Sequence, residues 1–334
     1  MTWGSPLAVT RRRPKRRPAR PDWYGCGWGI GICCGRRKGQ EVRVGSEEAG
    51  KRGWAALYDF GGTGPPVHLA HANGFPPGTY RPFVRALTSR FRVVGLPARP
   101  LWPGSRPEEM HNWHLMADDL IQGLDELGAR GIFGIGHSMG GVATLWAAVR
   151  RPDIFRAVVL IDPVILPPIL SIIVRWLRRA GINLRRSMIQ QALRRRRVWS
   201  SRRACFERYR TKPHFARWSD ECLWAYVEAV THERPDGQVE LAYPPEWEAR
   251  IYATVPTDVW KAIPRLHLPT LVVRGELSQT FLPQSLAAMR RRLPHARFAV
   301  IPEAGHLVPM ERPEEAGRIV REFLEKVGKE GSEE

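Results

Sequence analysis

The chain has 334 residues, of which 43% are hydrophobic, and it carries a formal net charge of +19 at pH 7. Its length allows one large α/β domain or two average domains, and its apolar content is sufficient for a large core. No apolar run approaches the roughly 18 to 20 residues that a membrane span needs, so no membrane-spanning helix is expected.

The positive charge is concentrated in two segments. Residues 1–53 contain thirteen Lys or Arg and four Asp or Glu, and residues 164–218 contain fifteen Lys or Arg and one acidic residue, Glu207. The rest of the chain is mildly acidic. Most of this charge is Arg. We favour a general bias of the chain toward Arg as its cause over a nucleic-acid site, although basic patches attract anions in general. No specific nucleic-acid partner is therefore expected.

Residues 1–53 are rich in Pro, Arg and Gly. The stretch "RRRPKRRPARPDWYGCGWGIGICCG" imitates a signal sequence, but Asp22 interrupts it and no small-residue cleavage motif follows. We predict a disordered extension that takes no part in the fold. The five cysteines have no CxxC spacing and no neighbouring His cluster, which is typical of reduced thiols in a cytoplasmic protein without a metal site.

From Trp54 onward, short apolar runs alternate with longer amphipathic segments. The expected strands are 56–60, 66–70, 91–96, 131–137, 157–162, 270–275 and 297–301, and the expected helices include 82–90, 113–129, 140–151 and 313–327. This alternation predicts an α/β fold with a mostly parallel, doubly wound sheet. The predicted core comprises residues 54–163 and 267–328, interrupted by a mainly helical insertion at 164–266 and followed by a flexible tail at 329–334.

The segment "GIFGIGHSMGGVATL" places Ser138 between an expected strand and an expected helix. Gly136 and Gly140 flank this serine at a spacing of two. This pattern is typical of a nucleophile elbow, in which a strained turn lifts the serine hydroxyl above the edge of the sheet. A serine hydroxyl needs a general base, and in this arrangement the base follows the last strand. The candidate base is His306, in "RFAVIPEAGHLVPMERPEE".

"HSMGG" followed far downstream by "AGHLVPMERPEE" resembles the α/β-hydrolase superfamily, in its single-domain serine hydrolase branch, from Trp54 to about Val327. The resemblance implies that "AHANGFPPGTYRPF" is the oxyanion loop, with Asn73-Gly74-Phe75-Pro76 in place of a family His-Gly-x-Pro pattern. The backbone N–H groups of Phe75 and Met139 would then face the oxyanion, and His71 would brace the loop. It also implies a helical cap inserted after the sixth strand.

The acid that orients His306 is open between two residues. Relatives carry an Asp shortly after the glycine that ends the strand before last, but this chain has "RGELSQTF", with Ser278 and Gln279 at those places. Asp162 ends the strand "AVVLID" and is the preferred candidate, and Glu276 is the alternative. If neither acts, weak or absent catalysis is expected.

The predicted substrate pocket contains Asn73, Gly74, His137 and Trp176, with His137 also packing the elbow. In "PPILSIIVRWLRRAGINLRR", an apolar face including Ile169, Ile172, Ile173 and Trp176 is expected to cover the pocket, in preference to lying on an anionic membrane. Aromatic residues further along favour a lid lined with rings, namely Trp199, Phe206, Tyr209, Phe215, Trp218 and Trp224.

The sequence therefore predicts a cytoplasmic serine hydrolase that cleaves a small-to-medium apolar ester, lactone or related acyl compound through an acyl-enzyme. No cofactor is expected. The alternative is a weak or inactive hydrolase-fold protein whose basic insertion and N-terminal arm bind a membrane surface or nucleic acid.

Overall fold

The computed structural model describes Met1, residues 41–42 and residues 57–330. The chain divides into two units, Met1–Arg36 and Arg37–Glu334, and nearly all described residues belong to the second. Of the predicted extension at 1–53, only Met1 and Glu41–Val42 are described, and residues 331–334 of the predicted tail also lie outside the described part.

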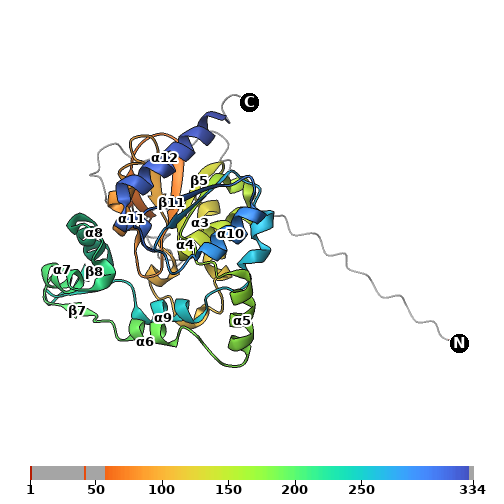
Figure 1. Cartoon of the computed structure of the whole chain (residues 1–334). Coiled ribbons are helices and arrows are strands. Elements are labelled where there is room, and N and C mark those ends of the chain that lie inside the picture. The colour runs from red at the N-terminus through yellow and green to blue at the C-terminus, as the bar shows by residue number, and fades with distance from the viewer. Residues whose placement is uncertain (2–40, 43–56, 331–334) are drawn as a thin grey trace. The chain divides into compact units, whose positions relative to one another are not determined.

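An eight-stranded sheet forms the centre of the second unit (Figure 1). Its first three strands in spatial order, β1, β2 and β4, pair antiparallel, and all other neighbours are parallel. The spatial order is β1 (Glu41–Val42), β2 (Leu57–Gly61), β4 (Arg92–Gly95), β3 (Pro66–Ala70), β5 (Ile132–His137), β6 (Phe155–Ile161), β10 (Thr270–Gly275) and β11 (Arg297–Ile301). The predicted α/β class with a mostly parallel sheet is confirmed.

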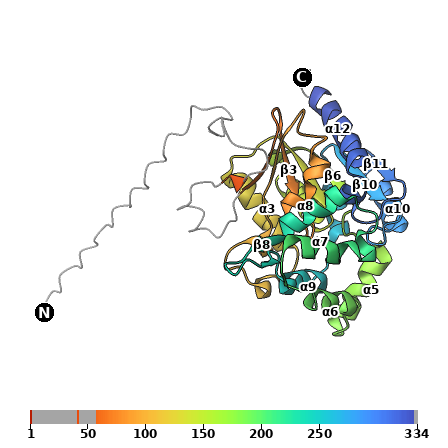
Figure 2. The same cartoon turned by 90° about the vertical axis from the view of Figure 1, so that its left-hand side faces the viewer.

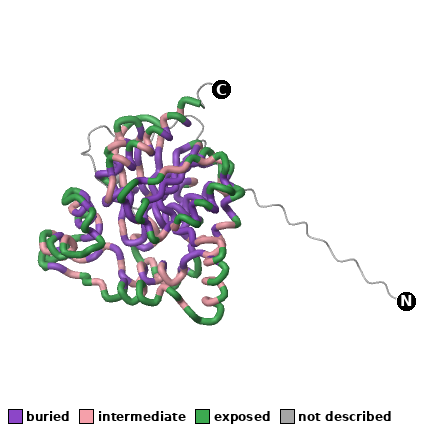
Figure 3. The backbone as a smooth tube through the Cα atoms, in the orientation of Figure 1, coloured by how far each residue is buried: buried purple, intermediate pink, exposed green. Residues whose placement is uncertain are grey.

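Helices cover both faces of this sheet. Every residue of β5 is buried, as expected for a strand with helices on both sides. Phe133 approaches Gly328 of one helix, whereas the next residue, Gly134, approaches Thr144 of another, and successive residues of a strand point to opposite faces. The helices are α2 (Arg81–Val84), α3 (His114–Glu126), α4 (Met139–Arg150), α10 (Pro283–Arg292), α11 (Val308–Glu311) and α12 (Pro313–Glu330). Figure 3 shows the buried core between them.

Two helices differ from the expectation. The helix expected at 82–90 is only the four residues of α2, because turns follow Val84 and bring the chain directly into β4. The helix α10 was not predicted from the pattern, since its ten residues include three consecutive arginines at its end and show little apolar periodicity. No helix in the described part is both long and apolar enough to cross a membrane.

Residues 164–266, here called the insertion, lie between β6 and β10. The insertion contains five α-helices and a small antiparallel sheet of order β7-β9-β8 that the pattern did not predict. Figures 1 and 2 show these elements grouped on one side of the main sheet. They are α5 (Pro168–Arg179), α6 (Arg186–Leu193), β7 (Val198–Trp199), α7 (Arg202–Arg210), α8 (Asp220–Val230), β8 (Thr231–Glu233), β9 (Val239–Leu241) and α9 (Pro245–Ala253).

The orientation of α5 is opposite to the expected one. Leu170 and Val174 pack on the core, and the guanidinium of Arg178 donates to the carbonyl of Val255 at 2.7 Å. These inward contacts turn the Ile169 stripe away from the body and into solvent, and Ile169 is 74% exposed. The expectation that this stripe covers the pocket is therefore wrong.

Candidate active site

Ser138 occupies a strained turn between β5 and α4. Its φ of 56° and ψ of −114° lie where a residue other than glycine is rarely found. A Cβ on Gly136 would lie 2.4 Å from the carbonyl oxygen of Gly140, and a Cβ on Gly140 would lie 2.1 Å from that of Ala70. Both glycines are therefore required by the close approach of α4 to the strands, which fixes the height of the serine above them.

Three side chains from distant parts of the sequence form a hydrogen-bonded line. Ser138 Oγ lies 2.9 Å from His306 Nε2, and His306 Nδ1 lies 2.8 Å from Asp162 Oδ1. Ser138 follows β5, Asp162 follows β6 and His306 lies in the loop after β11, so the carboxyl ends of parallel strands bring all three to one edge of the sheet. This order and geometry are those of a serine, base and acid triad.

Asp162 is fully buried and firmly held. Its backbone has a φ of 41°, and its Oδ2 accepts a hydrogen bond from the backbone N–H of Gly275 at 3.0 Å. The hydroxyl of Ser278 donates to Oδ1 at 2.6 Å. Ser278, which stands where the family resemblance implies an Asp, thus contacts the carboxylate that follows β6. Sequence reasoning noted the substitution but missed this contact.

Glu276 does not lie beside His306 in this way. Its Oε2 accepts a hydrogen bond from the backbone N–H of Glu303 at 3.0 Å. Of the two candidate acids, the structure therefore brings Asp162, and not Glu276, into contact with the imidazole.

Glu311 holds the loop that carries His306, a role that sequence reasoning missed. Its Oε2 accepts from the backbone N–H of Gly305 at 2.8 Å, and its Oε1 accepts from that of Leu307 at 3.2 Å. The carboxylate therefore bonds to the residues on both sides of the histidine. The signal in the sequence was the glutamate five residues after His306, which is the last residue of α11.

His137 lies behind the triad, where its burial excludes substrate, so its assignment to the substrate pocket is wrong. Its Nε2 is 3.0 Å from the carbonyl oxygen of His306 and therefore donates, which leaves Nδ1, at 2.8 Å, to accept from the Tyr80 hydroxyl. The Tyr80 oxygen also accepts from the backbone N–H of Ala72 at 2.9 Å. Burial and the nearby His306 lower the pKa of His137 to about 3, so the imidazole stays neutral.

The two expected oxyanion donors differ in their surroundings. The N–H of Met139 is the first of α4, where no hydrogen bond within the helix engages it, and it has no other backbone partner among the residues that the structure describes. The N–H of Phe75 donates to the carbonyl of Ala72 at 3.2 Å, a long turn bond. For both N–H groups to bind an oxyanion, the Phe75 N–H would have to leave the carbonyl of Ala72 or donate to both oxygens at once.

Asn73 and Gly74 tie the oxyanion loop to the insertion. The Asn73 amide nitrogen donates to the carbonyl of Glu248 at 3.2 Å, and its oxygen accepts from the Tyr243 hydroxyl at 2.9 Å. Gly74 has a φ of 79°, and a Cβ there would meet the ion pair of Arg195 and Glu248 at 3.5 Å. Both ends of the Asn73 amide are thus already bonded to protein, and its contact with substrate remains a prediction.

The Phe75 ring is part of an aromatic cluster within the insertion. Its centroid lies 5.3 Å from that of Tyr226 and 6.1 Å from that of Trp218, and Phe215 and Tyr209 extend the cluster. Trp176 lies apart from it. The Trp176 ring is 65% exposed and packs against the guanidinium of Arg179 at 5.5 Å, so its assignment to the pocket is wrong because the inward contacts of α5 turn it outward.

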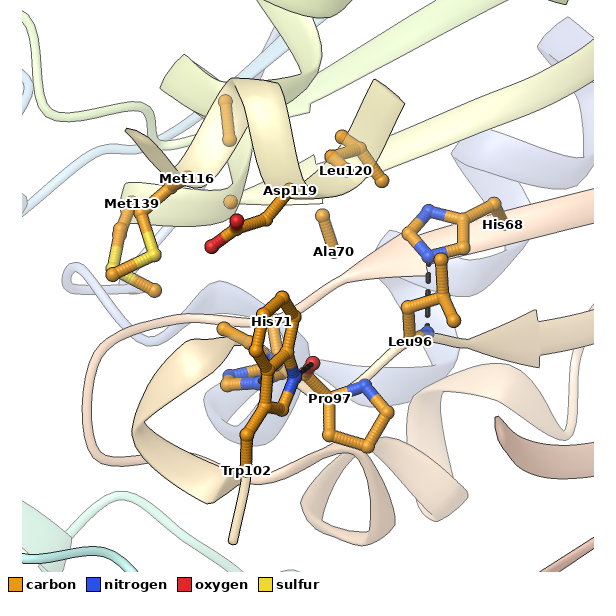
Figure 4. A pocket seen from close by; sticks show the side chains of 13 residues that line it. His68, Ala70, His71, Leu96, Pro97, Trp102, Met116, Asp119, Leu120 and Met139 are labelled. Atoms are coloured by element: carbon orange, nitrogen blue, oxygen red, sulfur yellow. Dashed lines mark hydrogen bonds between the residues drawn. The ribbon is translucent and has the colours of Figure 1, made fainter. Parts of the chain in front are cut away.

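A small cavity lies behind the oxyanion loop, as Figure 4 shows. It has a volume of about 40 Å³ and is lined by residues including Trp102, Asp119 and Met139, but by neither Ser138 nor His306. His71 at its edge bonds to the carbonyl of Ala72 at 2.8 Å through Nδ1 and accepts from the N–H of Ala98 at 2.9 Å. His71 thus bonds to the oxyanion loop and to the segment after β4, and the cavity is too small for an acyl substrate.

The Ser138 side chain is nearly closed off from solvent. Ser138 is 5% exposed, and the His306 side chain is 24% exposed. Substrate entry therefore requires side chains or parts of the insertion to move. Among the described residues, no cluster of three or more His, Cys, Asp or Glu side chains is arranged to hold a metal ion.

Comparison with known proteins gives matching results. Residues 69–317 match the model of the alpha/beta hydrolase family. An abhydrolase domain-containing protein of Alternaria alternata, ACTT2-1, is 26% identical over 248 residues, which cover 60% of this chain and 89% of that protein. The crystal structure of E-2-(acetamidomethylene)succinate hydrolase superimposes with a TM-score of 0.66 at 21% identity, covering 81% of this chain and 94% of that one.

A thermophilic esterase of Thermogutta terrifontis is 27% identical, with a TM-score of 0.57 and coverage of 81% of this chain and 93% of that one. The match to the family model spans most of the chain, including the elbow at Ser138 and the loop at His306. The protein therefore belongs to the alpha/beta hydrolase family and is a hydrolase.

Proposed function

We propose that this hydrolase cleaves a small-to-medium apolar ester, lactone or related acyl compound through an acyl-enzyme on Ser138. The observation that carries the proposal is the line of Ser138, His306 and Asp162, with separations of 2.9 and 2.8 Å. A strained elbow with a base within hydrogen-bond reach activates one hydroxyl among many.

In the proposed reaction, Ser138 Oγ attacks the acyl carbon while His306 Nε2 takes the hydroxyl proton. The imidazolium keeps its Nδ1–H on Asp162, whose negative charge stabilises it. The carbonyl oxygen, now negative, is bound by the N–H of Met139 and, once freed from Ala72, by that of Phe75. His306 then gives its proton to the leaving alkoxide as the acyl C–O bond breaks. Water attacks the acyl-enzyme by the same steps in reverse order.

An apolar acyl group is favoured by the surroundings of the oxyanion loop. The Phe75 ring packs on Tyr226 and Trp218, which are buried, and is itself partly exposed next to the proposed Phe75 donor. An apolar acyl group that covers the remaining exposed area of Phe75 gains free energy, at about 25 cal/mol per Å². The esterase name carried by the Thermogutta terrifontis relative also agrees with ester cleavage.

The test is labelling of the folded protein with a fluorophosphonate, followed by peptide mass spectrometry. We expect one adduct, on Ser138, and none in Ser138→Ala. The same preparations should hydrolyse p-nitrophenyl esters of short and medium acyl length only when Ser138 is present. An adduct on another residue, or a folded protein that neither labels nor turns over, would favour the inactive hydrolase-fold alternative.

A further inference from the structure

The exposed apolar side chains are concentrated in one short part of the insertion. Twelve large hydrophobic residues are exposed in the described part of the chain, and eight of them lie between residues 169 and 193. This group is here called the apolar strip. It consists of Ile169, Ile172, Ile173, Trp176, Ile182, Leu184, Met188 and Leu193. Exposed apolar side chains scattered singly are ordinary, but a group of this kind marks an interaction surface.

Helix α5 carries the first half of the strip on one face. Ile169, Ile172, Ile173 and Trp176 follow a spacing of three and four residues, which aligns them along the helix. Other side chains of α5 attach the helix to the rest of the protein. The guanidinium groups of Arg175 and Arg178 donate hydrogen bonds to the carbonyls of Thr257 and Val255. In Figures 1 and 3, α5 lies at the outer edge of the insertion and is coloured as exposed or intermediate along most of its length.

The second half of the strip lies between α5 and α6. Ile182, Leu184 and Met188 line a groove of about 370 Å³ together with Leu170 and Val174 of α5. The strip is therefore not a flat face but includes a recess, whose lining also contains polar side chains, namely Arg178, Asn183, Arg185, Gln279 and Thr280.

The segment that carries the strip has charges of one sign only, although Glu246 and Glu248 of α9 pair with its Arg197 and Arg195. From Pro163 to Phe206 the sequence contains eleven Arg and no Asp, Glu or Lys. Arg179, Arg186 and Arg194 are exposed, and none of them forms an ion pair with a carboxylate in the described part of the chain. A second copy of this face would place like charges opposite one another. A partner with an anionic surface and an apolar interior would pair with the arginines and bury the apolar side chains.

We propose that the apolar strip and its arginines dock on an anionic phospholipid bilayer, with α5 lying in the membrane interface. Amphipathic helices with a basic polar face and Ile, Leu or Trp on the other side bind membranes in this way. Trp176 beside Arg179 is suited to the headgroup level, where one side of the ring is apolar and the other is wet. The helix lies on the bilayer and does not span it.

The experiment is co-sedimentation of the full chain with vesicles of phosphatidylcholine alone or with added phosphatidylglycerol. We expect binding to the anionic vesicles that weakens with salt, and little binding to neutral ones. The triple variant Ile172→Ser/Ile173→Ser/Trp176→Ser should lower the partition coefficient by at least about tenfold. A triple variant Arg179→Gln/Arg186→Gln/Arg194→Gln should lower it on anionic vesicles only.

Matched controls come from exposed residues on other elements. Leu277→Ser/Val300→Ser removes exposed apolar groups elsewhere, and Arg291→Gln removes an exposed charge on α10, so neither should change vesicle binding. All substituted side chains are exposed, so melting temperatures should stay near that of the parent. The chain has thirteen tryptophans, so the contribution of Trp176 is the difference between the spectra of the parent and of Trp176→Phe, and this difference should shift to shorter wavelength on anionic vesicles.

Two results would overturn the proposal. Equal binding of the parent and the serine variant to anionic vesicles would assign membrane binding to other basic segments, such as residues 1–53. A parent dimer that the serine variant converts to monomer, without any change in vesicle binding, would make the strip an interface between copies.

Discussion

The position of the acid differs from the one that the family resemblance implies. The carboxylate comes from Asp162 just after β6, while Ser278 and the N–H of Gly275, in the segment where the resemblance implies an Asp, hold it by hydrogen bonds. Both candidate acids can be tested with the same chemical change, from carboxylate to amide, because Glu276 lies nearby but bonds to Glu303 instead.

We predict that Asp162→Asn lowers kcat by at least about 10²-fold, because the amide keeps the shape but loses the charge that stabilises the imidazolium. Glu276→Gln, the matched control, should lower kcat by less than about tenfold. Steady-state kinetics on a p-nitrophenyl ester, with circular dichroism to verify folding, measure both. The reverse ranking of the two variants would show that Glu276 is the acid.

Tyr80 is a positioning residue that links the oxyanion loop to the back of the triad. Its oxygen accepts from Ala72, its hydroxyl donates to His137, and His137 donates to the carbonyl of His306. In Tyr80→Phe, two buried polar groups lose their partner, which costs about 1–3 kcal/mol of stability for each. Because the loop and His306 both lose a constraint, we expect kcat to fall by about tenfold with KM changing little.

A control for Tyr80→Phe is Ser285→Ala, which also deletes a buried hydroxyl. The Ser285 hydroxyl donates to the carbonyl of Ile165 at 2.7 Å and has no described contact with the triad. This variant should lower the melting temperature and leave kcat unchanged. If Tyr80→Phe likewise lost stability alone, its hydroxyl would be structural and not positioning.

At the scale of elements, strands β3 and β5 carry histidines that are buried and neutral. Burial lowers the pKa of His68 to about 3 and that of His71, just after β3, to about 4, and His137 at the end of β5 behaves similarly. In the unfolded chain a histidine has a pKa near 6.5. Between that value and the folded one, only the unfolded state binds the proton, so stability falls as the pH decreases through this window.

We therefore predict that acidification from pH 7.5 to pH 5 destabilises the fold, with about 2 kcal/mol contributed by each such histidine. His68→Gln removes the titrating group, so the variant lacks the pH-dependent destabilisation that His68 contributes. The glutamine amide oxygen can accept the hydrogen bond from the N–H of Leu96 that His68 Nε2 accepts in the parent. We define the stability gap as the free energy of unfolding of the parent minus that of the variant, each measured by urea unfolding. This gap should be smaller at pH 5 than at pH 7.5 by about 2 kcal/mol. A gap for His68→Gln that is the same at both pH values would contradict the prediction.

The elements differ in how well the sequence alone predicts them. Strands β5 and β10 are fully buried, and each appears in the sequence as a short apolar run. This local pattern was sufficient to place both strands, and the glycine spacing around Ser138 was sufficient to place the elbow. The contact between Asp162 and His306 depends on the pairing of distant strands, so the sequence could only rank it. The face that α5 buries depends on Arg178 reaching a carbonyl 77 residues further along the chain, which no local periodicity encodes.

The insertion and the oxyanion loop are mechanically coupled on the scale of the whole molecule. Asn73 bonds to Tyr243 and Glu248, and Phe75 packs among the rings of the insertion, while Ser138 is nearly closed off. An opening of the insertion around Tyr243 and Glu248 would therefore break contacts with the same loop that we propose to supply an oxyanion donor. Closure after substrate entry would restore the loop, which couples binding to the assembly of the site.

The last prediction concerns the boundary between the two units of the chain, at Arg36 and Arg37. Residues 1–36 offer no periodic apolar face, so deleting them should leave kcat and the melting temperature unchanged. Deletion through residue 53 also removes β1, in which Glu41 pairs with Tyr58 and Val42 with Leu57 of β2. The loss of this pairing should lower the free energy of unfolding by on the order of 1 kcal/mol, or the melting temperature by about 2–4 °C. We expect kcat to stay unchanged, because β4 and β3 separate β2 from β5 in the sheet. Calorimetry and ester hydrolysis of the two truncated proteins measure this. A loss of turnover on removal of residues 1–36 would show that this arm contributes to the site.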